Sequence, residues 1–406
     1  MLLLGCSTPA PEVTATLQDT TVGNVVVVEW DSESEVAGTV SAGEGNRTPS
    51  VVATHHRHTV WGLPPDEAVV LSVEEAGAAV AEVTVQTIAV PSEVPEVTLE
   101  FGTWEGFVAI PYATLDGEHS GAVVVDGQGR TVAWAVADRP NATNVAWDGT
   151  AIWYNEVNVP SALWRVPLDG GEATSLEVPD AHHEFVLLGD DVIPGGGVAY
   201  LRMVEQLVGE ENIYGDQLVF RGHDGSERVV WDAFDTEVVS EPHEGWSYIP
   251  GGSDWTHVNG LSRDAARGTW LVSLYWLRQV LEIDEATGQV VRRLDGSVGD
   301  VFGPQHAVEP TEAGVLLFDN QKFGERSSVA EVDWNGTVVW RWSPDPEVTT
   351  LVLGDVDRLP DGRTLSAWGT DGGVIGLDAA GEEAFRLRLE DLFVVGQAES
   401  RASLYE

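Results

Sequence analysis

Three histidines stand at the start of three successive strand-forming segments of this chain. His183, His257 and His306 each come before an apolar run that is broken by glycine. Near neutral pH an imidazole can act as a nucleophile, a general base or a metal ligand. In a closed ring of repeats, equivalent positions point at one axis. The spacing therefore predicts that these three imidazoles meet in a single pocket.

The segment around the second histidine reads Asp-Trp-Thr-His-Val-Asn-Gly-Leu from Asp254 to Leu261. Residues two apart on a β-strand share a face, so His257 and Asn259 are expected to point the same way. An imidazole beside an amide can clamp a negatively charged oxygen. The same pair also suits a buried histidine that is hydrogen-bonded to a neighbouring strand, and both interpretations stay open.

A metal site is a further interpretation of the histidines. His182 and His183 precede Glu184, and paired imidazoles with a carboxylate can bind a metal. No carboxylate is adjacent to His257 or His306 in the sequence. We therefore expect chemistry without a metal or an organic cofactor.

The ring that must position these residues is indicated by a repeated turn. Each copy has an aspartate, a turn with glycine and then an alternating strand, which is a hairpin signal. The six aspartates are Asp126, Asp169, Asp224, Asp284, Asp333 and Asp378. Their mean spacing is (378 − 126)/5, about 50 residues, in the range typical of propellers. Residues 96–406 are thus predicted to form a six-bladed β-propeller in an all-β protein, with paired β-sandwiches as the alternative.

Residues 12–95 have a different texture, with short strands separated by glycine, proline and polar turns, and predict a small β-sandwich. The spacing of Trp30 and the Gly-Leu-Pro-Pro turn at 62–65 resembles a fibronectin type III domain, although the tyrosine that usually follows the turn is absent. Pro91 and Pro95 stiffen the linker to the propeller. Three histidines of this domain are expected on a solvated strand or turn: His55, His56 and His58.

The formal charge of −45 over 406 residues argues against a nucleic acid or an anionic membrane surface as a partner, because a strongly negative field repels both. Lys322 is the only lysine, so cationic chemistry falls on arginine and histidine. The 43% hydrophobic content and 16 tryptophans agree with a large buried core.

The first eleven residues resemble the end of a bacterial lipoprotein signal followed by a tether. Cys6 follows Leu-Leu-Gly, but the basic start and most of the apolar stretch of an export signal are missing, which suggests a start codon further upstream. We expect Cys6 to be lipidated and the protein to be extracytoplasmic, in the periplasm, at the outer membrane or at the cell surface. Contact with a membrane would then be through the lipid alone. A single cysteine allows no internal disulfide.

Taken together, these motifs resemble the bacterial arylsulfate sulfotransferases, which are six-bladed propellers with a small N-terminal β-domain. The resemblance covers 182–345. It rests on the His-His-Glu-Phe run at 182–185, the run at 254–259, the Ile-Asp turn at 283–288, Gln305-His306, the Phe-Asp-Asn run at 318–320 and the strand at 328–333.

The resemblance implies sulfuryl transfer from a phenolic sulfate ester to a phenol, independent of a nucleotide sulfate donor, through a sulfohistidine. His306 matches the nucleophile, and His257 with Asn259 matches a pair that contacts sulfate oxygens. His183 matches a further active-site histidine, with His182 as the alternative. Asn320 is a candidate to line the pocket. The family also makes a homodimer possible.

One position departs from the family. Counting back from Ile283 places Tyr275 where the family carries an arginine. A guanidinium offers a fixed positive fork to sulfate, whereas a phenol offers one hydrogen bond. Arg278 is three residues further on and is expected to point to the opposite face unless a bulge intervenes. A ligand-binding propeller that is catalytically altered or inactive is therefore the second hypothesis.

Overall fold

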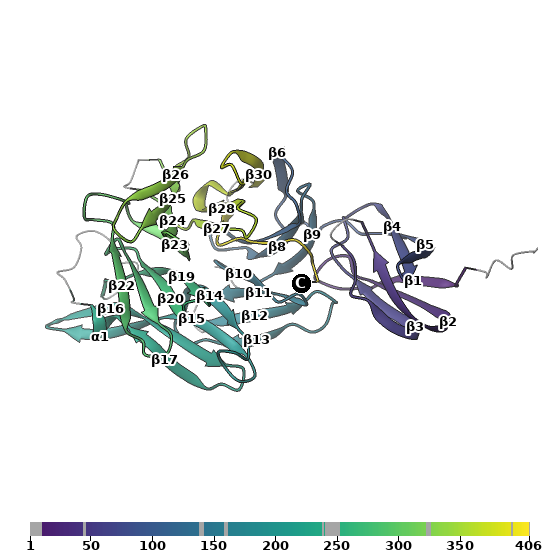
Figure 1. The fold of residues 1–406 in the computed structure, drawn as a ribbon, viewed down its shortest axis with the longest axis horizontal. Coiled ribbons are helices and arrows are strands. Elements are labelled where there is room, and N and C mark those ends of the chain that lie inside the picture. Colours follow the sequence, from purple (N-terminus) through teal and green to yellow (C-terminus); the bar gives the residue numbers. More distant parts are fainter. Residues whose placement is uncertain are drawn as a thin grey trace, which may run out of the picture.

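The computed structural model describes residues 10–43, 46–137, 142–157, 161–237, 239, 252–321, 326–390 and 393–405. Cys6 and Lys322 lie outside these residues. Over the described chain the protein is all-β, as predicted, with one four-residue helix, α1 (Ala233–Thr236), and one 3-10 turn, η1 (Gly369–Asp371). A smaller N-terminal domain lies beside a larger one (Figure 1).

The N-terminal domain is organised around one long strand. Its strands are β1 (Val13–Leu17), β2 (Val26–Ser41), β3 (Val51–Val60), β4 (Ala68–Glu75) and β5 (Ala78–Gln86). β2 pairs with β1 through its first residues, with β3 along most of its length and with β4 through its last residues, and β4 pairs with β5. Apolar side chains on alternate positions of these strands, with Trp30, form a buried core.

Two histidines of this domain correct the expectation of a solvated strand. His56 and His58 are only 0% and 4% exposed, and both rings stack on Trp30, with centroids 4.5 and 5.3 Å away. They are two residues apart on β3 and so share its inner face. Burial, followed by the charge of His56, lowers the pKa of His58. His55 is exposed, as expected, and pairs with Asp31.

The larger domain consists, within the described residues, of six sheets that follow one another along the chain. The first contains β7 (Phe107–Thr114), β8 (Ser120–Asp126) and β9 (Thr131–Val136), and the second β10 (Val145–Trp147), β11 (Ala151–Glu156), β12 (Ala162–Pro167) and β13 (Thr174–Glu177). The third contains β14 (Ala181–Leu188), β15 (Gly197–Val208), β16 (Glu211–Gly222), β17 (Glu227–Asp232) and the short β18 (Ser253–Asp254).

The fourth sheet contains β19 (Val258–Asp264), β20 (Thr269–Leu274), β21 (Gln279–Asp284) and β22 (Val290–Asp295). The fifth contains β23 (Gln305–Pro310), β24 (Gly314–Asp319), β25 (Ser328–Asp333) and β26 (Val338–Trp342), and the sixth β27 (Asp355–Arg358), β28 (Thr364–Trp368), β29 (Gly373–Leu377) and β30 (Glu383–Leu389). Neighbouring strands are antiparallel throughout, except that β18 runs parallel to β16.

The two ends of this domain are joined through shared sheets. The C-terminal strands β31 (Phe393–Val395) and β32 (Glu399–Arg401) pair with β7 in the first sheet. β6 (Val97–Gly102) pairs with β30 in the sixth. Consecutive up-and-down sheets closed in this way form a β-propeller, which leaves only short edges unpaired.

The repeated aspartates are explained by the turns they close. Each one lies between the third and fourth strands of its sheet, and its carboxylate accepts backbone N–H groups of the turn. Asp333, for example, accepts from Asn335 at 2.9 Å and from Thr337 at 2.8 Å. An aspartate that bonds the backbone two residues on is a favoured turn residue, which is why the sequence repeats it.

The two domains share a packed boundary. Val22 and Val25 belong to the same buried cluster as Leu404 near the C-terminus, and Trp61 stacks on Tyr405 with centroids 4.4 Å apart. Gly23 bridges to Ala133 of the propeller. A Cβ at Gly23 would lie 3.1 Å from a backbone oxygen, and its φ of 129° is one that favours glycine.

No helix in the described part of the chain has the length and apolar character needed to span a membrane.

Candidate functional site

The site lies where three neighbouring innermost strands are irregular. β14, β19 and β23 each carry a β-bulge, between His182 and Phe185, Val258 and Gly260, and His306 and Glu309, respectively. Left-handed backbone accompanies the bulges: φ is 51° at His183, 46° at His257 and 48° at Ala307. Bulges re-aim side chains, and such backbone at a residue other than glycine costs about 1–3 kcal/mol. The surrounding sheets hold these residues in that conformation.

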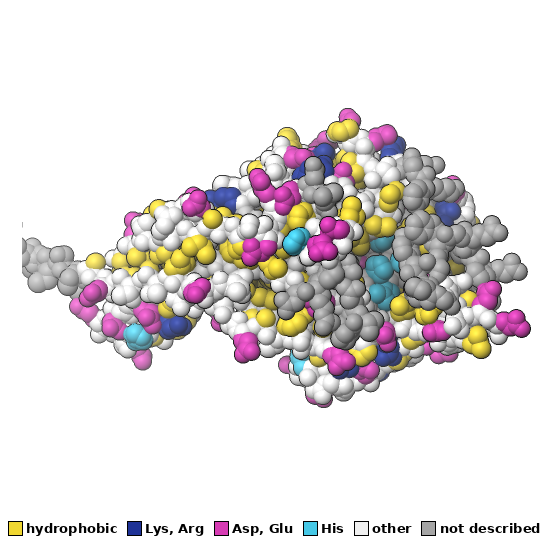
Figure 2. Space-filling model, turned by 180° about the vertical axis from the view of Figure 1, so that it is seen from behind, with side chains coloured by type: hydrophobic (Ala, Val, Ile, Leu, Met, Phe, Trp, Pro, Cys, Tyr) yellow, Lys and Arg dark blue, Asp and Glu magenta, His cyan; other side chains and the backbone are white. Residues whose placement is uncertain are grey.

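The imidazole rings converge, as the repeat predicted. The ring centroid of His183 lies 4.9 Å from that of His257 and 6.3 Å from that of His306. Tyr275 joins them, with its ring 5.5 Å from His257 and 5.2 Å from His306. Trp276 packs edge-on against Tyr275 and lies 6.0 Å from His257. On the face shown in Figure 2, a group of histidine side chains reaches the surface of the larger domain.

His306 is held in one tautomer by Asn320. The Asn320 amide nitrogen donates to the carbonyls of Thr350 and Leu353, at 3.2 and 2.8 Å, so its oxygen faces the ring. The His306 Nδ1–H then donates to that oxygen at 2.7 Å, which leaves the lone pair on Nε2. The backbone N–H of Leu353 points at Nε2 from 3.2 Å.

The environment of His306 keeps its ring uncharged. Burial lowers the pKa to about 3, against the raising effect of the Asn320 hydrogen bond and with a further lowering by His257. A neutral imidazole with a defined lone pair is the form that can act as a nucleophile.

His257 is oriented by a carboxylate. Its Nδ1–H donates to Asp254 Oδ2 at 2.6 Å, and the indole N–H of Trp276 donates to the same oxygen at 3.3 Å. The side chain of Asp254 is 6% exposed. A buried carboxylate behind an imidazole fixes the tautomer and the orientation of the ring.

The third histidine ends a chain of hydrogen bonds. Asp216 accepts from His182 Nε2 at 2.9 Å, and the Nδ1 atoms of His182 and His183 are 2.8 Å apart. Burial acts to raise the pKa of Asp216, but His182 and donors from Thr256 and Val258 hold it below its usual range. Burial, then the charges of the neighbouring histidines, lowers the pKa of His183.

Both histidines of the adjacent pair therefore belong to the site, in different positions. The ring of His183 contacts His257 and His306, whereas His182 lies behind it and bonds Asp216. The preference for His183 as the residue that faces the other histidines agrees with this arrangement.

Asn259 ties the innermost strands together. Its amide nitrogen donates to the Gln305 carbonyl at 2.9 Å, and its oxygen accepts from Ser273 at 3.1 Å. It is 2% exposed and lines a small pocket with His183 and His306. The structure thus places Asn259 beside the histidines but engages both ends of its amide with the protein.

Tyr275 occupies the site, and Arg278 does not. Arg278 lies at the end of the turn between β20 and β21, donates to the carbonyl of Phe302 at 2.9 Å and pairs with Asp300 at 2.7 Å. Among the described residues, the small pocket beside His306 is lined by no arginine or lysine.

Sequence reasoning missed three groups of the site. Asp254 stands three residues before His257, within the run already singled out, and could have been found there. Asp216 lies on β16, more than thirty residues from His182, and nothing local marks it. Leu353 contributes only backbone groups, its N–H and its carbonyl, which no residue type reveals.

The fold and the site define an all-β propeller with an imidazole cluster at the N-terminal ends of its innermost strands. No protein-family model matches the sequence. No curated protein matches it either.

Solved structures with a similar shape are distant in sequence. A Bacteroides caccae protein of unknown function is 10% identical with a TM-score of 0.45, covering 72% of this chain and 98% of its own. The periplasmic gluconolactonase of Pseudomonas aeruginosa is 12% identical with a TM-score of 0.44, covering 72% and 98%. Virginiamycin B lyase from Staphylococcus aureus is 9% identical with a TM-score of 0.36, covering 95% and 99%. Similarity at this level transfers no activity.

Proposed function

We propose that this protein is a sulfuryl transferase that moves SO₃ from a phenolic sulfate ester to a phenol through His306. The observation that carries the proposal is the state of His306: Nδ1–H is fixed on Asn320, Nε2 holds a lone pair, and the rings of His183 and Tyr275 lie beside it. We also propose that the six sheets are the blades of a six-bladed propeller and that the N-terminal domain is a fibronectin type III-like spacer.

In the first step, His306 Nε2 attacks sulfur as the bond from sulfur to the phenolic oxygen breaks. The leaving phenolate takes the Nε2 proton of His257, which in this proposal enters the step as an imidazolium with its Nδ1–H donated to Asp254 and leaves it as a neutral imidazole. Asn320 is a neutral acceptor, so the Nδ1 proton stays on the ring of the sulfohistidine. The cationic ring and the anionic SO₃ group then sum to zero charge, which suits a buried site.

In the second step, the acceptor phenol attacks the same sulfur and the N–S bond breaks. The phenolic proton of the acceptor passes to His257, which gave up its own proton in the first step. Neutral His306 is thereby regenerated. Because the ring of the intermediate remains cationic, the imidazole is a good leaving group. The Leu353 N–H, now aimed at Nε2, can instead donate to a sulfuryl oxygen when sulfur occupies that place.

Tyr275 and Trp276 form the wall beside the histidines. Aromatic rings pack edge-on or offset against one another, so this wall favours a phenolic ring over an aliphatic alcohol. Tyr275 supplies a hydroxyl where the resembled family has a guanidinium, which predicts weaker stabilisation of the sulfate oxygens.

A second candidate is a ligand-binding propeller without catalysis. It is favoured by the lack of arginine or lysine lining the described pocket at His306. The two candidates differ in one outcome, namely turnover.

The test is an assay of the full chain with a chromogenic aryl sulfate, with and without added phenol. Phenolate release that increases with phenol and disappears in His306→Ala supports transfer. His55→Ala, at an exposed position of the N-terminal domain, is the matched control. Absence of release across several aryl sulfates from folded protein would exclude the transferase and leave ligand binding.

A lipid anchor at Cys6 and an extracytoplasmic location are part of the proposal. Both are tested by comparing membrane fractionation of the cell-expressed chain with that of Cys6→Ser.

A further inference from the structure

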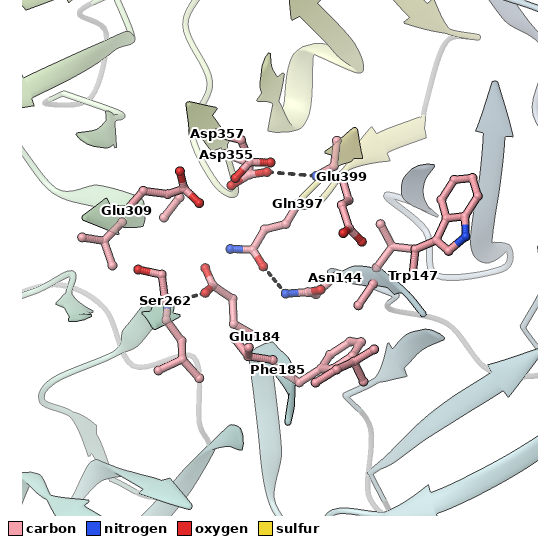
Figure 3. Close-up of a pocket in the computed structure, with 18 of the residues that line it drawn as sticks. Asn144, Trp147, Glu184, Phe185, Ser262, Glu309, Asp355, Asp357, Gln397 and Glu399 are labelled. Carbon is pink, nitrogen blue, oxygen red and sulfur yellow. Dashed lines mark hydrogen bonds between the residues drawn. The ribbon is translucent and has the colours of Figure 1, made fainter. Parts of the chain in front are cut away.

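A second titratable cluster lies along the propeller axis, on the other side of Glu184 from the histidines. It surrounds a cavity of about 310 Å³ that is lined by the innermost strands of several sheets (Figure 3). Its carboxylates are Glu184 from β14, Glu309 from β23, Asp355 and Asp357 from β27, and Glu399 from β32. The proposed transfer reaction uses none of them.

The cavity contains far more negative than positive charge. Within the described chain, Arg401 is its only basic lining residue, and it pairs with Glu399. Against the larger effect of burial, Arg401 also acts to lower the pKa of Asp357, and Arg358, outside the lining, that of Glu309. Asp357 and Glu309 hydrogen-bond each other. Glu184 and Asp355 form no ion pair with a lysine or arginine of the lining. Buried carboxylates without a compensating charge are strongly unfavourable, so either protons or a cation must neutralise them.

Protein donors satisfy these carboxylates only in part. Asp355 accepts the Ala398 N–H at 3.0 Å, and Glu309 accepts the Arg358 N–H at 3.1 Å. Glu184 accepts the Leu261 N–H through Oε2. Its other oxygen, Oε1, has no hydrogen-bond partner although the residue is only 4% exposed. Glu184 extends into the cavity, toward the amides of Asn144 and Gln397 (Figure 3).

Burial and mutual repulsion act on the acid groups in the same direction. Burial, then repulsion by Asp355, raises the pKa of Glu184, and burial, then repulsion by Asp357, raises that of Asp355. Burial raises the pKa of Glu309 to about 7. Positive charge inside the cavity would relieve this repulsion.

We propose that the cavity binds one Ca²⁺-like cation, held directly by Glu184 and through bridging waters by Glu309, Asp355 and Asp357. Hard cations take six to eight oxygen ligands in flexible geometry, and the lining has carboxylate and amide oxygens but no histidine or cysteine.

The ion is bound with part of its water shell. No three histidine, cysteine or acidic side chains of the described chain already lie together at metal-binding geometry. With about 30 Å³ per water, the cavity has room for the ion and several bridging waters. The free Oε1 of Glu184 is the first direct ligand.

The experiment is calorimetric titration of the full chain with CaCl₂ at pH 8 and moderate ionic strength. The cavity variant is Glu309→Gln with Asp357→Asn. The control is Asp31→Asn with Glu347→Gln, which removes the same charge from side chains that are 82% and 66% exposed. We expect one saturable ion per chain in the wild type and the control, and binding weakened at least about tenfold in the cavity variant.

Thermal unfolding in a chelator shows whether the cavity variant is folded. We expect its Tm to equal or exceed that of the wild type, because two repelling charges are gone, while added Ca²⁺ raises Tm only in the wild type and the control. Glu184→Gln provides a second variant with the same expectation for binding.

Equally weak binding at several sites in the wild type, the cavity variant and the control would overturn the proposal. Such binding would reflect only the general attraction of cations to a chain with a charge of −45. Absence of binding with a Tm that increases on acidification, in the wild type more than in the cavity variant, would also overturn it, since protons would then neutralise the cavity. Neither result depends on sulfuryl transfer.

Discussion

The histidine cluster and the acidic cavity occupy the same propeller axis, and adjacent residues of β14 enter both: His183 joins the imidazoles and Glu184 lines the cavity. In the first region, His182, His257 and His306 each place a ring nitrogen on an acceptor: Asp216, Asp254 and Asn320, respectively. In the second, acid groups face one another and one oxygen of Glu184 has no partner. A hydrogen-bond partner of defined polarity fixes the protonation state of an imidazole, which chemistry requires. Buried carboxylates that face one another are instead stable only when a proton or a cation neutralises them.

The largest expected effect is the loss of activity when the central histidine of the cluster is removed. His306→Ala removes the nucleophile and should lower kcat/KM for aryl sulfates by at least about 10³-fold, because binding and oxygen donors alone remain. Steady-state kinetics measure this. Asn320→Ala should lose less, since the nucleophile persists in a mixture of tautomers, and an equal loss in the two variants would contradict the assigned role of His306.

His257→Gln should have the next largest effect, about 10²-fold or more, because it removes the proposed general acid. The loss should shrink as the leaving phenol becomes more acidic, since a stable phenolate needs no proton. Comparison of aryl sulfates with different phenol pKa values measures the trend. A loss independent of the leaving group would assign His257 a structural role.

The smallest expected effect is on the pH dependence of folding stability, which should differ in sign between the two regions. Glu309 has its pKa raised from 4.5 to about 7, so the folded state binds more protons than the unfolded state between these values. Stability should therefore fall as pH rises from about 4.5 to 7, by at most about 3 kcal/mol, and Glu309→Gln should flatten this fall.

His306 acts with the opposite sign, because its pKa is lowered from 6.5 to about 3. Its contribution to stability is present above pH 6.5 and is lost as pH falls toward 3. Denaturant unfolding of wild type, Glu309→Gln and His306→Ala across pH 4–8 separates the two. Equal slopes of stability against pH between pH 5 and 7 in the wild type and Glu309→Gln would contradict the raised pKa of Glu309.

The sequence predicts a feature when the interactions that cause it are between residues close together in the chain. The turn aspartates, such as Asp333, bond the backbone two to four residues away, so their spacing revealed the repeated sheets and the convergence of the histidines. Asp216 and Leu353 reach the site from distant strands and left no signal. His56 and His58 were misjudged because histidine is polar, while stacking on Trp30 buries both.

The acidic cavity was also hidden from sequence analysis. The chain has 66 aspartates and glutamates, so the five that line the cavity do not stand out among them. Only the closure of the sheets brings Glu309, Asp357 and Glu399 to one axis. The charge composition therefore indicates an acidic surface, but it does not tell which acidic residues the topology brings together in the interior.

The most direct test of the account is to trap the intermediate. The full chain is mixed with excess aryl sulfate without acceptor, quenched at alkaline pH and digested, and the peptides are analysed by mass spectrometry. The account predicts one added SO₃ on the peptide that contains His306 and the loss of this label after a chase with phenol. In Asn259→Ala, the amount of label should fall only in proportion to the loss of activity. Sulfation confined to another residue, or phenolate release with no labelled histidine at any time, would contradict it.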